Sequence, residues 1–348
     1  MPRFNEAPSA LYTTSELFAG YDPARPESYG LTPDFQIYHE FVADGGAAST
    51  NRTMVMARAR HDCSILELLA DRLIGRKVVA IMGGHAVSRG TQAYVDAATV
   101  AAMLTEREFL VITGGGPGAM EAAHLGAAIG EPGRDLDEAL RHIGAKPLDA
   151  GGMPVRFTGD PADPAPVDPK AVTALGEYYR AGWEVRQSYP DGGGIAIPTW
   201  MYGWEPTTVF AAEVAKYFQN SIREDGLLAA ATHGIAYAQG SAGTLQEIFQ
   251  DAAQNYYRSF PAPAEAGHGV FSPMVFLGDH WTVDDAGRKT LPVRHLLDKL
   301  WATNARVSSD AANLVSYVTT PGAAASAIEA FSGLPTAPAL LVAAGRLR

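Results

Sequence analysis

The sequence predicts an α/β fold of the Rossmann-like, doubly wound type, with a mainly parallel sheet and helices on both faces. Two observations carry this prediction. Short apolar runs alternate with longer segments of helical periodicity, and several of the apolar runs end in glycine, as in βαβ units. The chain of 348 residues is long enough for one large domain of this kind with additions.

Residues 1–60 are predicted to form an irregular N-terminal extension. Proline and glycine alternate there with many aromatic residues, which is unusual for a disordered segment. We therefore expect the extension to lie on the main domain or on a partner subunit. The Rossmann-like domain itself is expected over 61–335, and 336–348 is expected to form a C-terminal tail.

The first half of the domain shows the alternation clearly. A helical pattern from about 64 to 74 precedes a buried strand at 77–82, which ends at Gly83-Gly84. The elements expected next are a helix at 91–106, a strand at 109–113 that runs into "GGGPG", and a helix at 119–129.

Residues 130–192 interrupt this pattern. They are rich in proline, aspartate and glycine, as in "FTGDPADPAPVDP", and contain one candidate helix near 171–180. A long insertion in a compact domain indicates a functional or interface element.

The alternation then resumes to the end of the domain. Strands are expected at 194–198, 233–238, 273–277 and 314–318. Helices are expected at 207–218, 222–231, 244–257, 293–301 and 322–331.

Composition limits the function classes. The net charge of −11 argues against a nucleic-acid partner, which needs a basic face, although a local phosphate pocket remains possible. The single cysteine, Cys63, excludes an intramolecular disulfide, favours a cytoplasmic location and is expected to be a plain buried or half-buried thiol. No apolar run approaches the ~18 residues of a membrane span, and no signal-peptide layout opens the chain.

Three strand ends carry glycine-rich loops: 83–84, 114–118 and 240–243. In an open parallel sheet, ligands bind beyond the carboxyl ends of the strands. Glycine lets the backbone approach a ligand closely, and the helix that follows offers free N–H groups to an anion. Together these loops predict a nucleotide or sugar-phosphate ligand.

Two common nucleotide motifs are missing. The "GGGPG" loop does not have the G-x-G-x-x-G spacing of dinucleotide-binding proteins, and no acidic residue ends the next strand, which disfavours a dehydrogenase. There is also no G-x-x-x-x-G-K-[ST] loop, which disfavours a Walker-type nucleoside triphosphatase.

The segments "VITGGGPGAMEAAHLGA" (111–127), "GIAIP" (194–198) and "GSAGTLQE" (240–247) resemble the LOG family. Members of this family are nucleoside 5′-monophosphate phosphoribohydrolases, of which some release cytokinins and many were formerly labelled lysine decarboxylases. The segments "MGGHAVSRGT" and "ATHGIAYAQG" are similar to bacterial pyrimidine/purine nucleotide 5′-monophosphate nucleosidases. The resemblance covers roughly residues 75–280.

The resemblance implies a catalytic pair and a phosphate site. Glu247 ends the family motif P-G-G-x-G-T-x-x-E, in which Gln239 here replaces the proline and Ser241 replaces a glycine. The family's helical arginine lies 23 residues before the glutamate. That offset falls on Glu224, and Arg223 lies one residue earlier. The binding residues implied are Gly83, Gly84, His85, Arg89, Gly115, Gly116, Gly118, Glu121, Gly240, Ser241, Ala242, Gly243 and Thr244.

The chemistry agrees with these roles. An N-glycosidic bond breaks through an oxocarbenium-like transition state, which a fixed anion stabilises. Glu247, expected in the first turn of the helix that holds the 5′-phosphate, would stay charged near the positive helix end and stabilise charge or position the nucleophile. Arg223 would orient Glu247 or clamp the phosphate.

Each residue also has a structural alternative. Thr244 and Glu247 match a T-x-x-E capping box that needs no ligand. Arg223 and Arg89 could be exposed charges and His85 a surface hydrogen-bonding group, whereas Glu121 could reach the ribose hydroxyls. The aromatic residues Trp200, Tyr202 and Trp204 could stack on a base or cover a dimer interface.

The leading hypothesis is hydrolysis of an AMP-like nucleoside 5′-monophosphate to free base and ribose 5-phosphate, by a homodimer or higher homo-oligomer that needs no metal or cofactor. The alternative is a non-catalytic nucleotide sensor or carrier on the same fold. Lysine decarboxylase activity is disfavoured because no lysine has a recognisable pyridoxal-phosphate context.

Overall fold

The computed structural model describes residues 2–130, 132–145, 166–201, 206–258 and 271–331. Its centre is a seven-stranded, all-parallel sheet with the strand order β4-β3-β2-β1-β5-β6-β7. The chain runs outward from β1 to β4 in one direction and from β5 to β7 in the other. The predicted doubly wound α/β fold is confirmed, and its strand order reverses between β1 and β5.

The strands are short and their carboxyl ends are level. They are β1 (Lys77–Met82), β2 (Phe109–Thr113), β3 (Ile195–Ala196), β4 (Glu213–Val214), β5 (Ile235–Tyr237), β6 (Met274–Leu277) and β7 (Val315–Val318). Met82 pairs with Tyr237, Ala80 pairs with both Ile112 and Ile235, and Thr113 pairs with Ala196. The loops that leave β1, β2 and β5 therefore emerge at one edge of the sheet.

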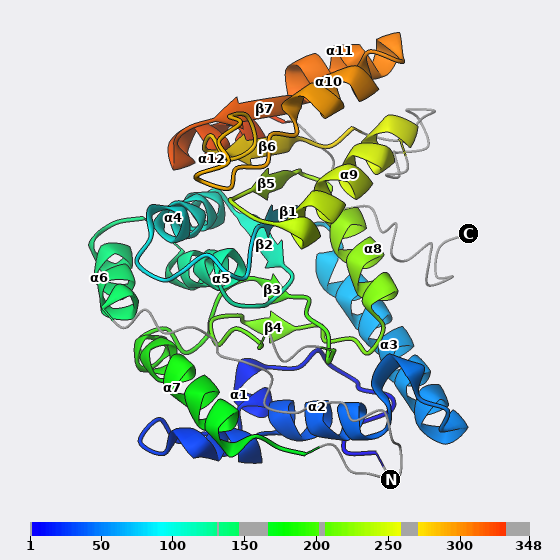
Figure 1. Ribbon diagram of the computed structural model, residues 1–348, viewed down its shortest axis with the longest axis vertical. Helices are drawn as coiled ribbons and strands as arrows, with labels where there is room; N and C mark the ends of the chain where they lie inside the picture. Colours follow the sequence, from blue (N-terminus) through cyan, green and yellow to red (C-terminus); the bar gives the residue numbers. More distant parts are fainter. Residues whose placement is uncertain (1, 131, 146–165, 202–205, 259–270, 332–348) are drawn as a thin grey trace.

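Helices cover both faces of the sheet (Figure 1). One layer contains α4 (Gln92–Glu106), α5 (Ala119–Ile129) and α12 (Pro321–Glu329). The other contains α3 (Arg52–Leu73), α8 (Asn220–Ala230) and α9 (Ala242–Tyr257), with α10 (Arg294–Trp301) and α11 (Ala305–Leu314) beyond β6 and β7.

Alternate residues of the strands supply the two cores. In β1, Val78 and Ala80 belong to the cluster with Leu69 of α3, whereas Val79 and Ile81 belong to the cluster under α4 and α12. Because successive side chains of a strand point to opposite faces, a continuous apolar run is needed when both faces are covered. This explains why each strand appears in the sequence as an unbroken run of apolar residues.

The N-terminal extension is more regular than its sequence predicts. It contains α1 (Thr14–Leu17), two 3₁₀ segments, η1 (Pro26–Leu31) and η2 (Gly46–Ala48), and α2 (Pro33–Ala43). The expectation of an irregular segment over 1–60 is therefore wrong, and the next helix, α3, begins at Arg52 rather than near residue 64. Local caps explain part of this, because Thr13, Thr32 and Asn51 each accept a hydrogen bond at a helix start.

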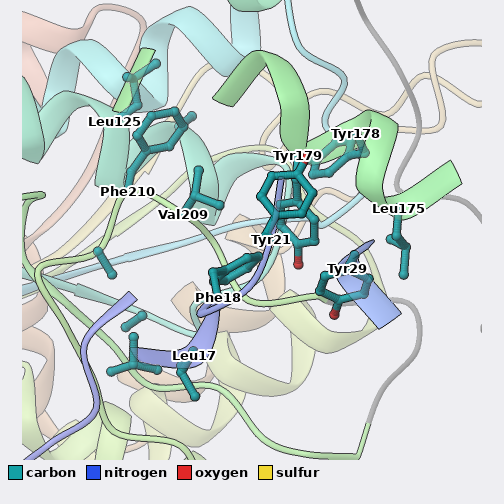
Figure 2. Packing of buried hydrophobic residues seen from close by; sticks show 14 of the residues in the cluster. Leu17, Phe18, Tyr21, Tyr29, Leu125, Leu175, Tyr178, Tyr179, Val209 and Phe210 are labelled. Carbon is teal, nitrogen blue, oxygen red and sulfur yellow. The ribbon is translucent and has the colours of Figure 1, made fainter. Parts of the chain in front are cut away.

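The extension packs on the same chain, as one of the two alternatives predicted. Its aromatic residues insert against α7 (Pro169–Arg186) and the segment before β4 (Figure 2). The ring of Phe18 meets that of Tyr179 edge-on at 4.7 Å, and the ring of Tyr29 lies 5.0 Å from the same tyrosine. Aromatic pairs of this geometry contribute stability beyond the area they bury.

The segment 207–218 is not a helix, contrary to expectation. It contains the two-residue strand β4, which pairs with β3 and is bridged in antiparallel fashion by Tyr12 of the extension. Residues 207–211 and 214–218 are buried. A segment covered on all sides has no exposed face, so amphipathic periodicity cannot distinguish a buried helix from a buried strand.

The insertion over 130–192 is largely helical where the structure describes it. It comprises α6 (Arg134–Gly144) and α7, which is longer than the helix predicted near 171–180. Residues 146–165, with most of the proline-rich run, and the predicted tail 336–348 lie outside the described residues. Of the helices that the structure describes, none combines the length and apolar character that a bilayer crossing requires.

Candidate functional site

The three glycine-rich loops meet at the reversal of the strand order. They follow β2, β1 and β5, which are adjacent in the sheet. The backbone N–H of Gly84 donates to the carbonyl of Gln239 at 2.9 Å, and the N–H of Ala119 donates to the carbonyl of Gly84 at 3.2 Å. The loop after β1 is thus held between the other two, as expected for a ligand crevice at this point.

The glycines permit this close contact. A Cβ atom on Gly84 would lie 3.2 Å from the Cα of Gly240, and one on Gly83 would lie 2.6 Å from the Cβ of Ala119. Gly118 has a φ of 70°, and a Cβ there would press on the carbonyl of His85 at 2.6 Å. These positions therefore accept only glycine without movement of the loops.

The loop after β2 is buried and internally bonded. Gly115 has a φ of 74°, its N–H donates to the Thr113 hydroxyl at 2.9 Å, and its carbonyl accepts from the N–H of Thr208 at 2.8 Å. Gly116 is also buried. This loop is therefore a buried part of the sheet edge rather than an exposed rim.

The N-terminus of α9 faces open space. Its N-cap, Ser241, makes no side-chain capping bond among the described residues, and Ser241, Ala242 and Gly243 are exposed. A Cβ atom on Gly243 would meet no described heavy atom within 4 Å. An uncapped and uncrowded helix start of this kind can bind an anion through its backbone N–H groups.

The alternative of a T-x-x-E capping box is wrong, and so is the first-turn position expected for Glu247. The helix starts at Ala242, so Thr244 is a buried third-position residue and Glu247 belongs to the second turn rather than the first. The side chain of Thr244 occupies the space next to Gly240 that a Cβ would need. Glu247 is half-buried and acts electrostatically on Tyr237, the last residue of β5.

Arg223 points from α8 toward the loop after β2. Its side chain is largely buried, and its Nη1 would lie 3.5 Å from a Cβ on Gly114. Its Nε and Nη2 donate to the Oδ1 of Asn220 at 3.1 and 2.8 Å, and Glu224 lies 3.4 Å away. Arg223 is therefore not an exposed helix charge, and its guanidinium borders the glycine loops.

Arg89 and Glu121 are buried together. The Nε and Nη2 of Arg89 donate to the two carboxylate oxygens of Glu121, each at 2.7 Å, and the hydroxyls of Tyr94 and Tyr178 donate to the same carboxylate at 2.6 and 2.8 Å. Burial alone raises the pKa of Glu121, but Arg89 and these donors outweigh it and lower the pKa below its usual value. The pair connects the loop after β1, α5 and α7.

The remaining candidates are dispersed. His85 is exposed in the loop after β1. Trp200 is 1% exposed, and its ring stacks on that of Phe218 with the ring centres 5.7 Å apart. The ammonium group of Lys216 lies 4.2 Å from the centre of the Trp200 ring. Tyr202 and Trp204 lie outside the described residues. Cys63 is exposed on α3, so the expected buried or half-buried thiol is wrong.

Sequence reasoning missed a second set of residues around the loops. The ring Nε2 of His280 lies 2.9 Å from the Gly240 carbonyl, and the Nε1 of Trp281 donates to the Tyr237 carbonyl at 3.2 Å. The Tyr237 hydroxyl donates to Asp251 at 2.8 Å. Only the spacing of Asp251, four residues after Glu247 on one helix, could have indicated it. No group of metal-binding side chains occurs within the described parts of the chain.

Comparison with known proteins adds little to this geometry. No family model matches the chain, and no curated protein matches it. One similar solved structure is the molybdenum cofactor binding protein from the phototrophic bacterium Rippkaea orientalis, at 10% identity and a TM-score of 0.33. That alignment covers 73% of this chain and 96% of the other. We draw no functional conclusion from a similarity of this level.

Proposed function

We propose that this protein hydrolyses the N-glycosidic bond of a nucleoside 5′-monophosphate and releases the free base and ribose 5-phosphate. The observation that carries the proposal is the meeting of three glycine loops with Arg223 and the open start of α9 at one edge of the sheet. A phosphate fits this edge because backbone N–H groups and a cation are available to it.

The proposed roles follow from position. The 5′-phosphate binds at the N-terminus of α9, where Ala242 and Gly243 present exposed backbone. Glu247 lies on the next turn of the same helix, four residues after Gly243 and about 6 Å further along the axis. That spacing places its carboxylate near the anomeric carbon of a bound ribose, where it stabilises the developing positive charge or positions the attacking water.

Arg223 and the buried Arg89–Glu121 pair have different roles in this proposal. Arg223 lies beside Gly114 in the loop after β2, and it contacts the phosphate or orients Glu247. Arg89 and Glu121 neutralise each other's charges, and their residues are only 4% and 1% exposed. We therefore propose that they hold the loop after β1 in place rather than contact the ligand.

The test is base release from AMP, GMP, CMP and UMP by the purified protein. Glu247→Gln should lower kcat by about 100-fold or more, because it removes the charge that the transition state needs, while AMP still binds. Arg223→Lys keeps a charge but loses the fork geometry and should mainly raise KM. As a matched control, Gln246→Ala changes the exposed neighbour of Glu247 and should leave both constants unchanged.

A second candidate function has its own supporting observation. The Arg223 guanidinium is already bonded to Asn220, and the loop carries Gln239 and Ser241 where the resembled family has proline and glycine. These features fit a nucleotide sensor or carrier that binds without catalysis. Tight AMP binding with no base release, unchanged in Glu247→Gln, would favour this function over hydrolysis.

A further inference from the structure

A buried carboxyl group lies one helical turn behind Glu247. Asp251 follows it by four residues on α9, is 0% exposed, and accepts a hydrogen bond from the Tyr237 hydroxyl at 2.8 Å. Within the described parts of the chain it forms no ion pair with a basic side chain. A buried acid without a cation is costly, and such groups concentrate at functional sites.

Two contacts hold Asp251 in place. Its Oδ2 is bound by Tyr237, and its Oδ1 lies 3.4 Å from the Nδ2 of Asn255, whose own Oδ1 accepts the backbone N–H of Ser272 at 2.8 Å. The Tyr237 carbonyl is in turn bound by Trp281. The carboxyl group therefore has one fixed orientation between α9 and the ends of β5 and β6.

Tyr237 connects Asp251 with Glu247. The charges of Asp251 and Glu247 both raise the pKa of the Tyr237 hydroxyl, which burial raises most. The other charged or titratable groups beside Glu247 and Asp251 come from α8 and the loop after β6. On α8 these are Arg223, which we propose to orient Glu247, its neighbour Glu224, and Asp225, which accepts a hydrogen bond from Gln250 of α9. His280 of the loop after β6 bonds the Gly240 carbonyl.

The protonation state of Asp251 changes near neutral pH. Burial raises its pKa from 3.8 to about 7, and the hydrogen bond from Tyr237 offsets a part of this rise. Asp251 therefore holds its proton below about pH 7 and loses it above. In the ionised form α9 carries two anions about 6 Å apart along its axis, and they lie about 6 and 12 Å along that axis from Gly243 at the proposed phosphate site.

We propose that Asp251, hydrogen-bonded to Tyr237 and one turn behind Glu247, is a positioning residue whose loss of a proton weakens nucleotide binding at the N-terminus of α9. This inference rests on the proposed function. When Asp251 is neutral, Glu247 is the single anionic side chain of α9. The ionised acid adds repulsion toward a phosphate dianion and opposes the positive end of the helix.

The test is the pH dependence of kcat and KM for AMP, measured over about two units on either side of pH 7. In the wild-type protein, KM should rise about threefold through neutral pH while kcat changes little. Asp251→Asn keeps the shape without the charge, so its KM should stay at the acid-side value. Tyr237→Phe removes the bond that favours the ionised form, so the rise should move to higher pH.

Asp225→Asn is the matched control. It also removes one negative charge beside α9, but from an exposed position on α8, and the wild-type profile should persist. Superimposable KM profiles of the wild type and Asp251→Asn would overturn the inference. A change in Asp225→Asn as large as that in Asp251→Asn would also overturn it.

A failure of the proposed function is distinguishable from a failure of this inference. If AMP binds without base release, its Kd measured by calorimetry replaces KM in the same comparison. If AMP does not bind, the proposed function fails. Carboxyl ¹³C NMR then tests the coupling between Asp251 and Glu247 by itself: the Glu247 signal should show an inflection near pH 7 that Asp251→Asn removes. A Glu247 signal without that inflection in the wild type would refute the coupling.

Discussion

Two glycines of the loop after β5 have opposite surroundings. At Gly240 the side chain of Thr244 fills the space beside the Cα atom, whereas at Gly243 a Cβ would meet no described atom within 4 Å. Packing therefore explains the glycine at 240. It does not explain the one at 243, which lies in the first turn of α9 where alanine would be a better helix former. Close approach of the proposed phosphate to the backbone would supply a reason.

This contrast gives a prediction for paired variants. Gly240→Ala should destabilise the protein by about 1–3 kcal/mol, because Thr244 or the loop must move. Gly243→Ala should stabilise it by about 0.5–1 kcal/mol but weaken AMP binding, because the new methyl group occupies the ligand's space. Urea unfolding and calorimetric titration measure the two effects. Unchanged AMP binding by Gly243→Ala would place the phosphate elsewhere.

At the scale of elements, the start of α8 is held by a residue of α3. Both carboxylate oxygens of Asp62 accept backbone N–H groups, from Phe218 at 2.9 and 3.1 Å and from Gln219 at 2.9 Å. The Nδ1 of His61 lies 3.0 Å from the same carboxylate, and its Nε2 lies 2.9 Å from the Tyr12 hydroxyl. A chain of contacts thus runs from the extension to the helix that carries Arg223.

We expect Asp62→Ala to affect both stability and activity. The substitution leaves buried N–H groups without an acceptor, which should lower the free energy of unfolding by about 3 kcal/mol. It also removes a contact that holds the helix carrying Arg223, so kcat/KM should fall about tenfold. Thr320→Ala removes a cap from α12, where the hydroxyl accepts the N–H of Ala323, and should cost about 1 kcal/mol with normal activity. Equal activity of the two variants would argue against a positioning role for Asp62.

At the scale of the whole molecule, the extension is joined to the sheet by a buried ion pair. The Nζ of Lys216, just after β4, lies 2.5 Å from the Oδ1 of Asp34 on α2 and 2.6 Å from the Thr207 hydroxyl. Burial lowers the pKa of Lys216, and Asp34 offsets a part of this. The extension is therefore a part of the folded core rather than an appendage.

Double-mutant analysis tests this integration. Asp34→Asn should lower the free energy of unfolding by about 3–5 kcal/mol, because it leaves Lys216 buried without a counter-charge. The double variant Asp34→Leu with Lys216→Met should recover most of that loss, because neither charge is left buried. Urea denaturation measures all three proteins. Wild-type stability of Asp34→Asn would mean that the extension is only loosely attached.

Much of the fold follows from local pattern. The strands at 77–82 and 109–113 and the helices at 91–106 and 119–129 were predictable because each has a clear period and a glycine, a cap or a turn at its ends. The segment 207–218 was not, because its residues are buried on nearly every side and its strand is only two residues long. The helices of the extension depend on tertiary packing of their aromatic residues.

The sequence by itself determined the doubly wound sheet and the three glycine loops at its carboxyl edge, because alternating periods and turn residues are local properties and parallel strands end on a common edge. Tertiary structure alone decided how the charged residues are used. Arg89 pairs with Glu121, Arg223 borders Gly114, and Asp251 lies buried beneath Glu247. These contacts depend on burial and on distances between separate elements, which the spacing of residues along a chain does not specify.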